Sequence, residues 1–398
     1  MASAARTRLA GAVRTAAPLW VFAALPSAGL VNGALYAPLL FGLGGVLAVA
    51  GWAAGSARPR LDLPLLVLTA AFVALSWASL LWSVAPAETA RRALQLSAIA
   101  AACLLLLAVP PPAPDRAERL FPVLLAALAV GALAMLADRV AGYPMQHRLA
   151  AKATYAVTKY NRGLDYLALL VWPMLACGIA ARRHRRELAL ACILALLLSA
   201  VGKSTTAPVA LLVGGAALGL ALLAPRKVGG LAAGAVTLMA ITAPVWLRVA
   251  AQHRGALVGH IKASGIHRLE IWDYMTARVA ERPLLGWGLA AANAVPIRPE
   301  ELAHYRFVVP QGVYPHQQWL ELWLELGVAG VLVALAATLL VLGRIANLPP
   351  ATRAFGFATF AAAIAVSLSS FEITTDSWWA ALAGSAFLLR AAARLEAA

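Results

Sequence analysis

The stretch YPHQQWLELWLELGVAGVLVALAATLLVLG, from Tyr314 to Gly343, joins a polar entrance to a long apolar run. An apolar segment of about 20 residues is long enough to cross a hydrocarbon core of about 30 Å as a helix. We therefore predict a membrane-spanning helix over residues 316–343. His316 follows Pro315 at its start, which puts an imidazole at the boundary between water and membrane.

Other parts of the chain repeat this apolar pattern. The 398 residues are 62% hydrophobic and 13% charged, with a mean hydropathy of +0.79, whereas soluble domains carry about 25% charged residues. The ten-residue alternation of barrel strands is absent, and helices are the other structure that satisfies the backbone in lipid. The composition predicts an all-α, polytopic membrane helical bundle.

We predict about twelve transmembrane spans, at residues 17–32, 34–54, 62–82, 92–110, 120–138, 163–181, 187–202, 205–224, 229–247, 316–343, 352–371 and 378–394. The basic start MASAARTRLAGAVRTAAPLW resembles a cleavable signal, but we interpret it as a retained first span because so many spans follow it. The predicted parts are an N-terminal bundle over 1–247, a long loop over 248–315 and three C-terminal spans over 316–398.

The cysteines and the net charge exclude two classes of site. Cys103, Cys177 and Cys192 lie inside apolar runs without C-x-x-C spacing, which supports neither a disulfide framework nor a zinc site. The net charge of +16 comes largely from short loops between spans rather than from one soluble face. Such charge marks the cytoplasmic side of a membrane protein, where both termini are expected, and no nucleic-acid partner is predicted.

Two long loops, about 139–162 and 248–315, fall on the opposite side. The first carries five basic residues and no acidic one, against the usual charge bias of translocated loops. Binding of an anion, such as a phosphate group of a lipid, explains that excess. Contact with anionic lipid head groups is the alternative. The basic residues are Arg139, Arg148, Lys152, Lys159 and Arg162.

The second long loop contains an amphipathic helix. Between His267 and Glu281 the apolar residues recur at helical spacing, at Leu269, Trp272, Met275 and Val279. We predict that this helix lies at the outer membrane surface. Glycine and proline punctuate the segment after it, which predicts irregular structure up to His316.

His316 is the candidate general base. An imidazole with an ordinary pKa of about 6.5 accepts a proton near neutral pH, although an interfacial histidine bonded to a carbonyl is the alternative. Glu325 lies nine residues further on, so at about 100° per residue it points nearly opposite to His316. We expect Glu325 to pair with a donor on a neighbouring helix, because an unpaired carboxylate in a bundle is costly.

Arg268 begins the surface helix and is the candidate residue for binding the pyrophosphate. Its guanidinium stays charged and grips phosphate through two parallel hydrogen bonds, which suits a pyrophosphate. A salt bridge to Glu270 or Asp273 is the alternative.

Two further cations fall in the same outer layer. Lys203 ends a span, where snorkelling to the interface competes with a functional role. Arg162 begins span six, with Asp165 three residues on as a possible ion-pair partner. Together, Arg162, Lys203, Arg268 and His316 predict a site with three cations and one base, suited to a doubly anionic lipid-linked substrate.

Three motifs resemble the bacterial O-antigen ligase and polymerase superfamily. They are H-x-x-x-L-x-x-x-x-E-x-G (His316, Leu320, Glu325, Gly327), R-x-x-x-W (Arg268, Trp272) and RPLLGWG (Arg282 to Gly288). About twelve spans with a long loop before the last three also fit, so the resemblance covers most of the chain.

The resemblance implies a GT-C-like glycosyltransferase of the bacterial inner membrane whose active site faces the periplasm. The ligase branch moves O-antigen polysaccharide from undecaprenyl pyrophosphate to a sugar hydroxyl of lipid A-core, with inversion and without metal or cofactor. It implies His316 and Arg268 as catalytic residues. Where the family usually has serine-arginine this chain has GKSTT, which departs from the pattern at Lys203. With the cations of the first long loop and of span six, the predicted pyrophosphate contacts are Arg268, Arg162, Lys203, Arg148 and Lys159.

Three functions remain open at this point: an O-antigen ligase, an O-antigen polymerase or other lipid-linked glycan transferase, and a non-enzymatic lipid-glycan transporter. Ligase and polymerase share donor and chemistry and differ in the acceptor. A transporter is expected to hold its ionisable residues near the bilayer midplane, often in repeated halves. Here they gather at the outer boundary and no repeat is visible, which favours a transferase.

Overall fold

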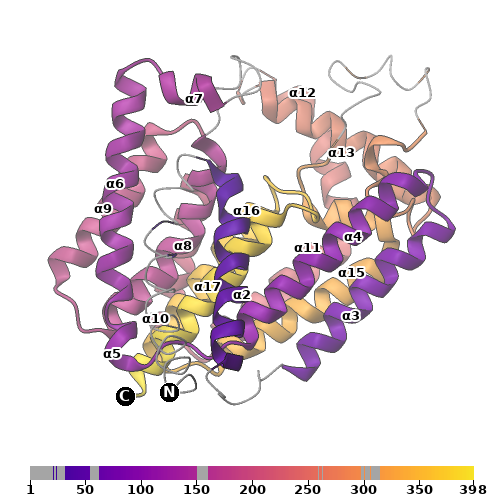
Figure 1. The fold of residues 1–398 in the computed structure, drawn as a ribbon. Helices are drawn as coiled ribbons and strands as arrows, with labels where there is room; N and C mark the ends of the chain where they lie inside the picture. The colour runs from indigo at the N-terminus through magenta and orange to yellow at the C-terminus, as the bar shows by residue number, and fades with distance from the viewer. Residues whose placement is uncertain are drawn as a thin grey trace.

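The described part of the protein is all-α. It is a computed structural model that describes residues 21, 24, 32–53, 62–149, 160–258, 260–261, 263–296, 300, 305 and 314–398. Within these residues the sole β-type pairing is an isolated bridge between Val258 and Ile261. The predicted fold class is confirmed (Figure 1).

Eleven long helices correspond to the predicted spans from 34–54 onward. Each boundary agrees within a few residues except the start of α4, which lies six residues before the predicted one. The predicted span 17–32 lies almost wholly outside the described residues. The long helices are α2 (Tyr36–Ala53), α3 (Leu63–Ala78), α4 (Pro86–Ala108), α6 (Leu120–Val140), α8 (Tyr160–Ala180), α9 (Arg185–Val201), α10 (Thr206–Leu223), α11 (Val228–Gln252), α15 (Gln318–Ala346), α16 (Pro350–Ser367) and α17 (Asp376–Glu396).

Eight of these helices are long and apolar enough to cross a membrane: α2, α3, α4, α6, α8, α10, α11 and α15. Among them α8 is the central one, since 89% of its most apolar window is buried inside the protein. The C-terminal helices α16 and α17 pack along α8, and α16 also packs along α10. The C-terminal helix α17 also packs along α2 and α4, so the end of the chain lies against its N-terminal part (Figure 1).

The shorter elements lie at the two ends of the bundle. They are η1 (Gly33–Leu35), η2 (Ser79–Leu81), α5 (Pro114–Ala117), α7 (Pro144–Leu149), α12 (Arg254–Leu257), α13 (Ala263–Glu281) and η4 (Ala291–Asn293). In Figure 1, α7, α12 and α13 occupy the end opposite to α5 and the C-terminus. The amphipathic helix predicted over His267–Glu281 is α13, which packs against α11 and α15.

The helix α15 is broken at Gly327, whose φ is +61° and ψ is −159°. The break frees the carbonyl groups of Leu324 and Glu325 from the helical pattern. They accept hydrogen bonds from the backbone N–H groups of Trp287 (2.9 Å) and Gly288 (2.9 Å). The RPLLGWG segment therefore inserts its backbone into the break.

The backbone N–H groups that follow the break are also hydrogen-bonded to the 283–288 loop. The N–H of Val328 donates to the carbonyl of Pro283 (2.9 Å), and the N–H of Ala329 donates to that of Leu284 (3.4 Å). Buried backbone groups in proteins are nearly always paired, and here the 283–288 loop supplies the partners that α15 lacks. The RPLLGWG motif and the motif that runs from His316 to Gly327 therefore form one backbone junction. This junction fixes the loop after α13 to α15. We call it the Gly327 junction.

Replacing Gly327 with alanine is expected to lower the free energy of unfolding by at least about 2 kcal/mol, since a left-handed residue with a side chain costs about 1–2 kcal/mol. A Cβ at this position also comes within 2.4 Å of the Leu284 carbonyl, which is backbone and cannot step aside. Thermal unfolding of the detergent-solubilised protein measures the loss.

Gly343→Ala is the matched control in the same helix. A Cβ there meets nothing within 4 Å, so this substitution should be neutral or stabilise the helix by about 0.5–1 kcal/mol. Equal unfolding temperatures for the two variants would contradict the role assigned to the junction.

Candidate active site

His316 lies two residues before the start of α15, at the end of the segment that links α13 to α15. Its φ is +53°, a left-handed conformation that residues with a side chain seldom adopt. Trp272 of α13 donates from its indole N–H to the carbonyl of Pro315 (2.7 Å), and the Gln317 side chain caps α15 by accepting from Leu320 N–H. The segment is thus held on both sides of His316, which maintains the strained backbone.

The imidazole of His316 has a specific set of neighbours. Its ring meets the ring of Tyr314 edge to face, with centroids 4.5 Å apart, and it hydrogen-bonds to the backbone of Ser370. Its Nδ1 is buried and has no hydrogen-bond partner. Burial, followed by the positive charges of Arg268 and His267, lowers the pKa of His316 to about 4. The imidazole is therefore neutral at pH 7 and its Nδ1 is free to accept a proton.

Arg268 of α13 lies close enough to His316 for its positive charge to lower the pKa of the imidazole. Burial lowers the pKa of Arg268, while the carboxylate of Asp165 and the phenol of Tyr314 raise it. Asp273, one of the two acids expected as alternative partners of Arg268, instead pairs with Arg254 at 3.0 Å. Arg268 thus faces His316, Tyr314 and Asp165.

Asp165 of α8 is a buried carboxylate of this site. It is 5% exposed, and its two oxygens accept hydrogen bonds from the hydroxyls of Ser204 (2.6 Å) and Ser370 (3.0 Å). Arg268 and Arg162 both act on its carboxylate electrostatically. The prediction of Asp165 as a partner of Arg162 is thus partly right, but Asp165 also joins α8 to the start of α10 and to the α16–α17 turn.

The remaining predicted cations are less closely placed. Lys203 is exposed in the turn between α9 and α10, where its neighbour Ser204 makes the contact with Asp165. Arg148 is exposed in the last turn of α7, and Lys159 lies outside the described residues. Among the residues that the structure describes, no hydrogen bond or ion pair joins Arg148 or Lys203 to Arg268, Asp165 or His316.

Glu325 has a different partner from the one expected. Its carboxylate accepts hydrogen bonds from the backbone N–H groups of Ala290 and Ala292, at the η4 turn. The expectation of a donor on a neighbouring helix is therefore wrong. Gly327 does admit a close neighbour, as predicted, but that neighbour is the 283–288 loop rather than a helix.

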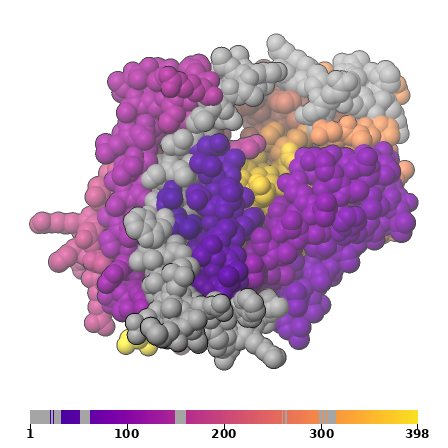
Figure 2. Space-filling view, viewed as in Figure 1, coloured from indigo at the N-terminus to yellow at the C-terminus, as the bar shows by residue number. Residues whose placement is uncertain are grey.

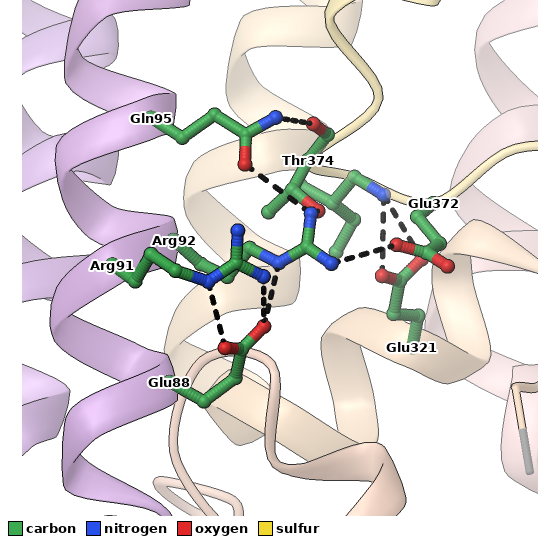
Figure 3. A network of polar contacts seen from close by, with 8 residues as sticks. Glu88, Arg91, Arg92, Gln95, Glu321, Glu372 and Thr374 are labelled. Atoms are coloured by element: carbon green, nitrogen blue, oxygen red, sulfur yellow. Dashed lines mark hydrogen bonds and ion pairs between the residues drawn. The ribbon is translucent and has the colours of Figure 1, made fainter. Parts of the chain in front are cut away.

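A second polar group, which sequence analysis missed, joins α4 to α15 and to the α16–α17 connection (Figure 3). In the first turns of α4, Glu88 binds both Arg91 (2.5 Å) and Arg92 (2.8 Å). Arg92 also lies 3.9 Å from Glu372, in the α16–α17 connection. Glu321 of α15 accepts from the N–H of Ile373 in the same connection. We call Glu88, Arg91, Arg92, Glu321 and Glu372 the α4 cluster.

Comparison with known proteins agrees with the motifs. Residues 188–335, which include Arg268 and His316, match the family model described as "O-Antigen ligase". A protein of Rickettsia felis named "Putative polysaccharide ligase" is 24% identical over 232 residues, which cover 57% of this chain and 56% of the relative. A protein of Rickettsia conorii with the same description is 30% identical over 119 residues, or 29% of each chain.

The matched segments thus span about half or less of the length of these curated relatives. The resemblance to the O-antigen ligase family, first carried by three short motifs, is confirmed by the family model and by these relatives.

Proposed function

We propose that this relative of the O-antigen ligases transfers O-antigen polysaccharide from undecaprenyl pyrophosphate to a sugar hydroxyl of lipid A-core. The observation that carries the proposal is a half-buried imidazole, whose buried Nδ1 has no hydrogen-bond partner, beside the half-buried guanidinium of Arg268. A proton acceptor next to a fixed positive charge suits a reaction in which a hydroxyl attacks and an anion departs.

The proposed reaction has one displacement step. The acceptor oxygen bonds to the anomeric carbon as its proton passes to Nδ1 of His316, and the bond from that carbon to the pyrophosphate oxygen breaks. Undecaprenyl pyrophosphate leaves with the bonding electrons, and the anomeric centre inverts because attack and departure are in line. Arg268 and Arg162 offset the charge that grows on the leaving group.

Pyrophosphate is a good leaving group and two guanidinium groups lie at the site, so the proposed mechanism uses neither a metal nor a cofactor. Lys203, Arg148 and Lys159 stay predicted phosphate contacts that could guide the lipid-linked donor from the membrane surface to Arg268.

The proposed location is the bacterial inner membrane, with the site facing the periplasm and both termini in the cytoplasm. The distribution of basic loops supports this orientation. The end of the bundle that carries α7, α12 and α13 is then the periplasmic end.

Complementation tests the function. Expression of the chain in a strain that lacks its own O-antigen ligase should restore long-chain lipopolysaccharide on a gel. If the chain instead restores only the ladder of chain lengths in a polymerase-deficient strain, the acceptor assignment is wrong and polymerisation is the activity.

The pH profile should show that His316 is an unusually weak base in the free protein. With a pKa of about 4, the imidazole becomes protonated and inactive only as pH falls through that value. The kcat/KM for the donor, which reports the free enzyme, should therefore stay nearly constant from pH 8 to about pH 5.5. Loss of half the activity near pH 6.5, the ordinary value for histidine, would contradict the burial and charge effects assigned to His316.

Donor binding should change that profile. A pyrophosphate at Arg268 cancels the positive charge that opposes protonation of His316, so the pKa of His316 in the complex should rise. The acid limb of kcat, which reports the complex, is then expected at higher pH than the acid limb of kcat/KM.

A further inference from the structure

Tyr314 lies between a group in which arginines predominate and a group in which carboxylates predominate. Its ring contacts His316, and its phenol interacts electrostatically with Arg268 and with the Glu321 and Glu372 carboxylates. Burial is the largest cause that raises the pKa of Tyr314 above its ordinary value, and those two carboxylates come next. The residue therefore borders the Arg268 site on one side and the α4 cluster on the other.

The two sides differ in charge. Around Arg268, two arginines face one carboxylate, Asp165. In the α4 cluster, two arginines are outnumbered by three carboxylates, and both arginines are already bound to Glu88. An anionic pyrophosphate is thus favoured on the Arg268 side. The α4 cluster instead offers carboxylate oxygens, which accept hydrogen bonds from neutral hydroxyl groups.

Glu372 is the carboxylate of this cluster that is available to a ligand. Glu321 is 3% exposed and directs both oxygens at the N–H of Ile373, so it positions the α16–α17 connection. The Glu372 side chain is 40% exposed, and its ion pair with Arg92 is long, at 3.9 Å. Figure 2 shows atoms of the yellow C-terminal part at the surface between α2 and α4.

The connection that carries Glu372 is held firmly. The preceding residue, Phe371, is 3% exposed and stacks between Tyr166 (centroids 5.0 Å apart) and Trp378 (5.3 Å). On the other side, Gln95 of α4 donates to the carbonyl of Thr374 (3.0 Å). Glu372 is thus presented from a fixed backbone, which reduces the entropy lost when a ligand binds.

Four buried polar atoms in the segment from Tyr314 to Gln318 have no hydrogen-bond partner. They are the Tyr314 hydroxyl, His316 Nδ1 and the side-chain nitrogens of Gln317 and Gln318. Buried polar groups are normally hydrogen-bonded, and each exception calls for an explanation. A ligand rich in hydroxyl groups satisfies donors and acceptors of both kinds at once.

We propose that Tyr314 and Glu372 bind the acceptor sugar and direct its reacting hydroxyl to His316. This inference rests on the proposed transferase function and names the acceptor part of the site. The sugar then approaches from the α4 cluster while the pyrophosphate leaves toward Arg268, so that nucleophile and leaving group lie on opposite sides of the anomeric carbon.

Steady-state kinetics of the full-length protein in nanodiscs tests this division. The donor is undecaprenyl pyrophosphate-linked O-antigen, and the acceptor is lipid A-core isolated from a ligase-deficient strain. Glu372→Gln keeps the shape but loses the charge-assisted hydrogen bond, so the acceptor KM should rise about 10-fold while the donor KM stays within about twofold. Tyr314→Phe, which removes only a hydroxyl, should raise the acceptor KM in the same selective way.

Two variants serve as controls. Arg162→Gln should show the reverse selectivity, with a raised donor KM and an unchanged acceptor KM. Glu118→Gln removes an exposed carboxylate beside α5, at the other end of the bundle, and should change neither constant.

The outcomes separate the two proposals. No transfer by the wild-type protein would overturn the transferase function itself. Transfer that persists while Glu372→Gln and Tyr314→Phe alter the donor KM, or both constants equally, would overturn the acceptor assignment and leave the transferase function standing. If Glu372→Gln fails to fold, as judged by thermal unfolding, Tyr314→Phe alone decides.

Discussion

Replacing His316 with asparagine is expected to lower kcat by about 10²–10⁴, the usual contribution of a general base. Asparagine is the informative substitution because it tolerates the left-handed backbone at φ +53° better than most residues. The backbone of the 314–317 segment is therefore preserved, while the amide cannot take a proton at neutral pH. The measurement is the single-turnover rate of glycan transfer to lipid A-core by the purified protein.

A matched histidine provides the control. His260 is exposed between α12 and α13, at the same end of the bundle, and His260→Asn should leave the rate unchanged. If His316→Asn retains the wild-type rate while its unfolding temperature is normal, His316 is not the base.

Replacing Arg268 with glutamine is expected to lower kcat by about 10²–10³, as for the loss of one donor that stabilises developing charge. The guanidinium lies beside His316, Tyr314 and Asp165 and is half-buried, where a charge interacts more strongly than in bulk water. Arg268→Lys keeps the positive charge but loses the planar fork, so an intermediate rate is expected. Rates of all variants are compared at saturating donor and acceptor.

Arg248 is the control for charge. It is exposed near the end of α11, at the same end of the bundle, and Arg248→Gln should reduce the rate little. An equal loss in Arg248→Gln and Arg268→Gln would show that general surface charge, rather than a specific contact, supports the reaction.

The sequence predicted the helices well because apolar segments of sufficient length have few alternatives in a membrane. The clearest miss is the start of α4. The predicted span began at residue 92 and left out Glu88 and Arg91, which are unfavourable in an apolar window, yet the helix begins at Pro86. Those charges are tolerated because they bind one another and reach Glu372, a contact across 280 residues of sequence.

Parts of the site were predictable and others were not. Arg268 and His316 stand out because they lie in the short motifs that resemble the ligase family, and the structure does bring them together. The role of Asp165 depends on Ser204 and Ser370, which lie on other helices and carry no local signal. Similarly, helical periodicity placed Glu325 without anticipating the break at Gly327, because the inserted 283–288 loop is a tertiary contact.

We propose that this chain joins a lipid-linked glycan to a lipid A-core sugar at the Arg268–His316 centre. The most direct measurement incubates the purified protein in nanodiscs with undecaprenyl pyrophosphate-linked O-antigen and isolated lipid A-core, with a chelator present, and follows the product by gel and mass spectrometry. We expect a covalent glycan–lipid A-core product with release of undecaprenyl pyrophosphate. His316→Asn should form at least about a hundredfold less product, the low end of a base's contribution. Absence of product from the folded wild-type protein, or equal product from the variant, would contradict the proposal.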